Sequence, residues 1–111
     1  KARPIGNGDE PLGDAMAVGA VRLRGWAGDL RGIREVRVRM DGRTVGATAL
    51  NWDRPDVSAA YPELRHGTDC HGWGLTIDLP EAGPHQLIIE AVNIDGCVGQ
   101  LGTRLITVPG T

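Results

Sequence analysis

The chain has 111 residues, which is the length of one ordinary domain. It contains 17 glycines and no phenylalanine, and this disfavours a helix bundle because each glycine costs a helix about 1 kcal/mol relative to alanine. The net charge of −2 removes the electrostatic basis of a general nucleic-acid binder. No apolar run approaches the roughly 20 residues that cross a bilayer. We therefore expect no nucleic-acid partner and no membrane insertion.

The chain opens with a polar segment and then begins to alternate. Residues 1–14 are predicted to be an N-terminal extension or linker. In residues 17–29 apolar or small residues alternate with large polar or aromatic ones, and this period of two predicts a strand with one buried face. The inward set is Val21, Leu23 and Gly25, and the outward set is Arg22, Arg24 and Trp26.

A hairpin is predicted next. Residues 33–40 again alternate, with Val36 and Val38 on one face, and Asp41-Gly42 follows directly. Asp-Gly between two strand-like runs is the strongest short-range hairpin signal. The return strand is predicted over residues 43–50.

Residues 51–70 lose all alternation and are predicted to be an insert loop. We expect one helical turn, starting near Pro55, ending before Pro62 and capped by Asp53 or a neighbouring residue. Alternation resumes in residues 72–79, where Trp73 points inward, and continues in 85–93. Asp95-Gly96 then predicts a second hairpin into residues 97–108.

Six or seven short strands with a turn signal about every ten residues are typical of a two-sheet sandwich. No alternation of strands with helices is present. The predicted fold is all-β, an immunoglobulin-like antiparallel β-sandwich of about seven strands formed by residues 1–111 as a single domain. Its long loop carries the helical turn, and Trp73 is the expected large core residue.

Several stretches carry recognisable motifs in a fixed order. They are Val-x-Leu-x-Gly-Trp-Ala at 21–27, Gly-Ile-x-x-Val-x-Val-x-x-Asp-Gly at 32–42 and Gly-Pro-His-x-Leu-x-x-x-Ala at 83–91. Together they resemble the bacterial immunoglobulin-like domains that recur as modules in multidomain bacterial proteins. A subgroup of those modules is similar through the insert too, at Arg-Pro-Asp-Val (54–57) and Ala-Tyr-Pro (60–62).

The resemblance implies a binding or spacer module and no catalytic activity. We expect an accessory domain of a larger bacterial protein, extracytoplasmic or on the cell surface. Its expected partners are the neighbouring domains of that protein and either a glycan or another protein. The insert is the expected functional surface because binding residues concentrate on loops held by a rigid scaffold. A pure structural spacer in a surface protein is the alternative.

The two cysteines are predicted to form a disulfide. In the predicted sandwich Cys70 and Cys97 lie at the same end, and a bridge would stabilise the fold by about 3 to 4 kcal/mol in the chain-entropy model. Two free thiols are one alternative. Zinc ligation together with His66 and His71 is the other, although the spacing matches no zinc ribbon.

Neither a calcium site nor a catalytic site is predicted. Acidic residues gather near the start (Asp9, Glu10, Asp14) and in the insert (Asp53, Asp56), but no spacing resembles a calcium-binding loop. Paired carboxylates for glycoside hydrolysis would have to come from Asp53, Asp56 or Glu63, and nothing separates these from surface acids. We expect no enzyme activity, no metal and no cofactor.

Carbohydrate binding through the aromatic residues of the insert is the more concrete binding hypothesis. Sugar-binding modules present flat aromatic rings with polar side chains alongside them. The candidate binding residues are Trp52, Arg54, Asp56, Tyr61 and, on the outward face of its strand, Trp26. In the opposing interpretation, Trp52 and Tyr61 fold the insert back onto the sandwich as a small satellite core.

Overall fold

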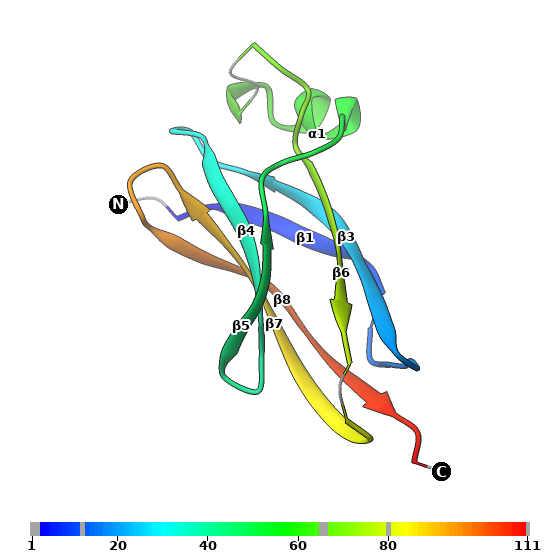
Figure 1. Ribbon diagram of the computed structural model, residues 1–111. Helices are drawn as coiled ribbons and strands as arrows, with labels where there is room; N and C mark the ends of the chain where they lie inside the picture. The colour runs from blue at the N-terminus through cyan, green and yellow to red at the C-terminus, as the bar shows by residue number, and fades with distance from the viewer. Residues whose placement is uncertain (1–2, 12, 65–66, 80, 111) are drawn as a thin grey trace.

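The computed structural model describes residues 3–11, 13–64, 67–79 and 81–110. Among these residues two β-sheets form the two layers of a sandwich (Figure 1), with strand orders β1-β3-β6 and β2-β8-β7-β4-β5. The strands are β1 (Ile5–Glu10), β2 (Ala15–Met16), β3 (Ala20–Gly28), β4 (Ile33–Met40), β5 (Arg43–Thr48), β6 (Gly72–Asp78), β7 (Gly83–Asn93) and β8 (Val98–Val108). The prediction of an all-β sandwich is confirmed.

The N-terminal segment differs from its prediction as a linker. Residues 5–10 form edge strand β1, which pairs antiparallel with β3 from Ile5 opposite Gly28 onward. Strand β2 adds a short parallel pair to β8. Gly6 allows the close approach, since a Cβ there would lie 2.2 Å from the carbonyl oxygen of Trp26. The glycines in this strand also remove the apolar alternation by which a strand is recognised.

Two side chains of other elements fix β1 in place. Arg104 on β8 donates hydrogen bonds of 2.7 Å to the carbonyl oxygens of Gly8 and Pro11. Arg54, from the insert, bonds to Asp9. These contacts come from residues far along the chain, so no local pattern in residues 5–10 predicts them.

Both predicted hairpins are present in the larger sheet. Asp41 and Gly42 join β4 to β5 with φ angles of 51° and 87°, the left-handed pair that an Asp-Gly turn supplies. The second hairpin joins β7 to β8, and the Asn93 amide donates to the carbonyl oxygen of Cys97 across it.

The core lies between the two sheets and contains Trp73, which is fully buried as predicted. The alternation on β3 is also as predicted, with Val21 and Leu23 buried and Arg22 and Arg24 facing outward. Gly25 leaves room for the indole, since a Cβ there would lie 2.7 Å from Cζ2 of Trp73. Glycine is therefore required opposite the largest core side chain.

The insert lies at one end of the sandwich (Figure 1). It contains helix α1 (Pro55–Ala60) and the 3₁₀ turn η1 (Pro62–Leu64), so the predicted helical turn is confirmed. The predicted cap is wrong, because Arg54 precedes the helix and no side chain caps its first turn. No helix of the described residues is long and apolar enough to cross a membrane.

Candidate functional site

The candidate site is the outer face of the β1-β3-β6 sheet, the face that points away from the core. The outward residues of β3 stand opposite small residues of β6 in the register: Arg22 opposite Thr76, Arg24 opposite Gly74 and Trp26 opposite Gly72. Two of these partners have no side chain, so the sheet leaves open space above β6. The first residues of the insert enter this space.

Trp52 occupies the space above Gly72. The Gly72 amide donates a 2.9 Å hydrogen bond to the carbonyl oxygen of Trp52, which joins the insert to β6. A Cβ on Gly72 would come within 2.3 Å of the indole, so the ring packs directly on the glycine. The guanidinium of Arg24 lies 3.8 Å from the ring centroid, within the range of a cation–π contact. Trp52 is held in place but keeps 36% of its surface exposed.

Two open grooves share Trp52 and Arg24 as a common wall. The first, here called the arginine groove, has a volume of about 430 Å³ and runs along β3 and β6. It is lined by Arg22, Arg24, Asn51, Trp52, Gly74, Leu75 and Thr76. The second, the β1 groove, has a volume of about 580 Å³ and is lined by Asp9, Glu10, Arg24, Trp52 and Arg54.

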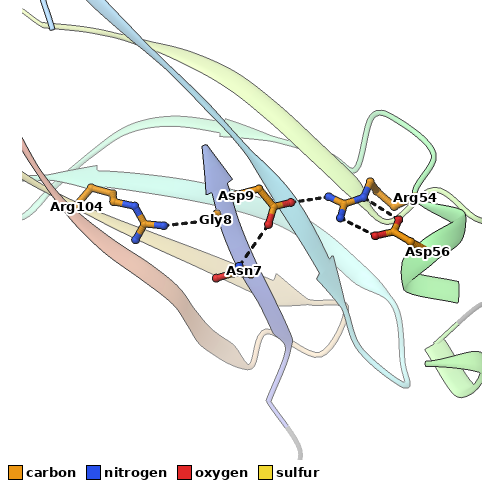
Figure 2. Close-up of polar contacts among 6 residues, drawn as sticks. All are labelled: Asn7, Gly8, Asp9, Arg54, Asp56 and Arg104. Atoms are coloured by element: carbon orange, nitrogen blue, oxygen red, sulfur yellow. Dashed lines mark hydrogen bonds and ion pairs between the residues drawn. The ribbon is translucent and has the colours of Figure 1, made fainter. Parts of the chain in front are cut away.

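The two grooves differ in charge. In the β1 groove, Arg54 donates to Asp9 at 2.6 Å and to the two carboxylate oxygens of Asp56 at 2.9 and 2.8 Å (Figure 2). The bond from Arg54 lowers the pKa of the Asp56 carboxyl, and the bonds to Asp56 and Asp9 raise the pKa of Arg54. In the arginine groove no lining residue is acidic. Within the described part of the chain, neither Arg22 nor Arg24 has a carboxylate at ion-pair distance.

The later part of the insert covers the upper end of the same face. The Tyr61 and Trp26 rings lie 5.4 Å apart with a 30° tilt between their planes. Leu64 is buried and packs on Gly28, where a Cβ would lie 2.7 Å from Cδ1 of Leu64. Val57 of α1 is buried as well. These contacts form a small apolar cluster between the insert and the sheet.

The predicted site residues therefore fall into two groups. Trp52, Arg54 and Asp56 lie beside the grooves, and Tyr61 pairs with Trp26 inside the covering cluster. Other residues that line the grooves were not among the predicted binding residues. Arg22 and Arg24 could have been found from their outward positions beside Trp26. Asp9 could not, because the sequence of residues 1–14 predicts an extension or linker and no strand.

The predicted disulfide is not observed, and the structure has Cys70 and Cys97 as free thiols. They lie at ends of different sheets, Cys70 just before β6 and Cys97 just before β8, and they line separate grooves. Placement at the same end of a sandwich is thus not enough to bring two sulfur atoms together.

The described residues hold no group of three His, Cys, Asp or Glu side chains that could bind a metal ion. His66, one of the considered zinc ligands, lies outside them. Three of the acids considered for calcium have other partners: Asp9 and Asp56 bind Arg54, and Asp14 accepts a hydrogen bond from the Leu105 amide. The lowered pKa of Asp56 is opposite to the raised value that a glycosidase acid needs.

Solved structures share this fold, including fibronectin(III)-like modules and a chitin binding domain. The chain superposes on fibronectin(III)-like modules of Clostridium thermocellum CbhA with a TM-score of 0.61 and 15% identity, over 98% of this chain and 48% of that one. It superposes on a chitin binding domain from Burkholderia pseudomallei with a TM-score of 0.52 and 12% identity, over 92% of this chain and 61% of that one. The chain thus spans about half the length of the first structure.

No protein-family model matches the chain, and no curated protein matches it. At identities this low, the structural likeness establishes the fold alone. Membership of the bacterial immunoglobulin-like family therefore stays a prediction, while the sandwich that it implied is observed.

Proposed function

We propose that this domain is a non-catalytic accessory module of a larger bacterial protein, located outside the cytoplasm, and that it binds a glycan on the outer face of the β1-β3-β6 sheet. The observation that carries the proposal is Trp52, a partly exposed indole that forms the wall between two open grooves. Aromatic rings bind the apolar faces of sugar rings, and large apolar side chains left open to solvent at a groove are typical of binding sites.

The surroundings of Trp52 support this use. Its ring is already fixed by Gly72 and Arg24, so binding costs little additional ordering of the side chain. Asn51 donates its amide hydrogens to the Gly74 carbonyl at 2.9 Å and to Thr48 at 3.2 Å, which orients the carboxamide beside the arginine groove. Its oxygen and the exposed Thr76 hydroxyl are suitable partners for sugar hydroxyls.

The structural neighbours add support at the level of the scaffold. One is described as a chitin binding domain and the other as fibronectin(III)-like modules, and accessory roles of this kind are compatible with the fold. Neither likeness identifies a ligand for this chain, which is why the proposal rests on Trp52.

A glycan array followed by calorimetric titration of the best ligand tests the proposal. Trp52→Ala should weaken binding at least about tenfold, which is the loss expected when a stacking ring is removed. Tyr61→Phe is the matched control, because it retains the ring packed on Trp26 and should bind normally. The proposal is refuted if the folded protein binds no glycan, or if Trp52→Ala binds as well as the wild type. If the protein releases new reducing ends from the bound glycan, the proposal that the module is non-catalytic is refuted.

A structural spacer is the second candidate function, and the shape of the molecule favours it. The domain measures 49 × 25 × 17 Å, and β1 begins at the end that carries the insert while β8 ends at the other (Figure 1). Neighbouring domains attached at these points would be held apart along the long axis. If the folded protein binds no glycan on the array, glycan binding is refuted and the spacer function is retained.

A further inference from the structure

The charge of the arginine groove narrows the class of ligand, on the condition that the proposed glycan binding is correct. We infer that the ligand is an acidic glycan, whose sugar ring contacts Trp52 while its carboxylate or sulfate binds Arg22 and Arg24. A neutral sugar would need hydroxyl partners in this groove, but it would not need two guanidinium groups. The inference rests on the position of these two arginines, which lie side by side in one groove that has no acidic lining residue.

Five other arginines have acceptors within the protein, whereas the exposed Arg3, Arg34 and Arg43 have none among the described residues. Arg31, Arg37, Arg39 and Arg54 pair with carboxylates, and Arg104 donates to backbone carbonyl oxygens. Arg22, by contrast, makes no hydrogen bond or ion pair within the described residues, and the recorded contact of the Arg24 guanidinium is the Trp52 ring. The protein carries a net charge of −2, so two unpaired arginines side by side do not follow from a general excess of basic residues.

The two arginines are placed to act together. They lie two residues apart on β3 and thus point to the same face, about 7 Å from each other along the strand. The Arg24 guanidinium carbon lies 3.8 Å from the centroid of the Trp52 ring, so its N–H donors lie beside the indole. A sugar ring against the exposed part of Trp52 would therefore bring an acidic substituent on its rim toward these donors. Arginine binds such groups strongly because it donates two parallel hydrogen bonds to them.

The acidic residues of the β1 groove make a long nucleic acid an unsuitable ligand. Asp9 and Glu10 line the β1 groove, and Asp56 lies beside it, so an extended polyanion crossing Trp52 would meet carboxylates there. Of the two grooves beside Trp52, only the arginine groove is lined by arginines without any acidic residue. A single acidic sugar, or a chain that follows this groove along β3 and β6, fits that distribution.

The test compares oligogalacturonate with its methyl ester, which has the same sugar ring without the charge, and extends to alginate and chondroitin sulfate oligomers. At low salt we expect the best acidic glycan to bind at least about tenfold more tightly than its neutral counterpart, with the preference reduced by added salt. Arg22→Gln should remove most of the preference, so that the acid and its ester bind with similar affinity. Arg43→Gln, which removes the same charge from an exposed position on β5, is the control and should have no effect.

The outcomes separate this inference from the proposed function. If glycans bind through Trp52 but acid and ester bind equally, or only neutral glycans bind, the inference is overturned and the function stands. If no glycan binds, both are overturned. Equal affinity for oligothymidylate would overturn the inference as well, since the groove would then bind any polyanion. Thermal unfolding of each variant confirms that it is folded.

Discussion

Substitution of Gly72 by alanine tests whether this glycine determines the position of Trp52. A Cβ at residue 72 would lie 2.3 Å from Cδ1 and Nε1 of the indole, far inside the 3.0 Å that real Cβ atoms respect. The ring would have to move, although its backbone stays joined to β6 by the hydrogen bond from the Gly72 amide. Overpacking of this kind costs about 1–3 kcal/mol, and we expect Gly72→Ala to lower the free energy of unfolding by that amount.

Gly74→Ala is the matched control because it lies on the same face of the same strand. A Cβ at residue 74 would make only ordinary contacts, 3.6 Å from Cγ of Arg24 and from the carbonyl oxygen of Leu23. This variant should be neutral or more stable by up to about 1 kcal/mol, since alanine reduces the freedom of the unfolded chain.

Urea unfolding measures the stability of the two variants, and ¹⁹F NMR of 5-fluorotryptophan protein measures the environment of the ring. The chain has three tryptophans, so Trp52→Phe assigns the resonance of Trp52. Gly72→Ala should shift that resonance toward the solvent-exposed value and weaken glycan binding. If the two alanine variants unfold at the same urea concentration and leave the resonance unmoved, the packing of Trp52 on Gly72 does not constrain the site.

Other predictions concern the scaffold. His85 is buried and its ring nitrogens face the Asp41 carboxylate at 2.8 Å and the Glu81 carbonyl at 2.9 Å, both of which raise its pKa. Its contribution to stability should be complete below pH 6.5 and lost as the pH rises through the raised folded value. Asp41→Asn should reduce this pH dependence in thermal melts, because it removes the larger of the two interactions that raise the pKa. Arg104→Met removes the charge-assisted hydrogen bonds to Gly8 and Pro11 and should lower the free energy of unfolding by about 1.5–3 kcal/mol. Amide hydrogen exchange in β1 should become faster. Unchanged exchange would contradict the role of Arg104. Leu64→Ala should cost about 2–3 kcal/mol and speed proteolysis within the insert, whereas a loss below about 0.5 kcal/mol would mean that the cover is not packed.

The sequence predicted those parts of the fold that local pattern determines. The alternation in residues 33–40 predicted β4 with its observed bounds, and Asp41-Gly42 predicted the turn because few other residue pairs adopt its left-handed angles. Strand β1 was missed for the opposite reason. Residues 5–10 carry two glycines and few apolar side chains, and they are held by the distant side chains of Arg54 and Arg104.

The candidate site was predictable only in part. The pattern placed Arg22, Arg24 and Trp26 outward on one strand and marked Trp52 as an aromatic residue of the insert. It could not show that Trp52 packs above Gly72, because a glycine indicates where side-chain volume is lacking and the sheet register decides what fills that space. The bond between Arg54 and Asp9 joins residues 45 positions apart, and neither residue indicates the other.

The insert combines the two roles that the sequence posed as alternatives, a packed cover and an open aromatic surface. Its later residues are buried against the sheet through Leu64 and Tyr61, while Trp52 at its start stays partly exposed beside the grooves. The two parts meet at Arg54, whose amide donates to the Asp69 carbonyl at 2.7 Å and whose side chain binds Asp9. Trp52 therefore lies between two fixed points, Gly72 on one side and Arg54 on the other. We therefore expect the packing of the cover to support the orientation of the indole, and a shortened loop that retains Trp52 but lacks Arg54 to bind glycans more weakly in calorimetric titration.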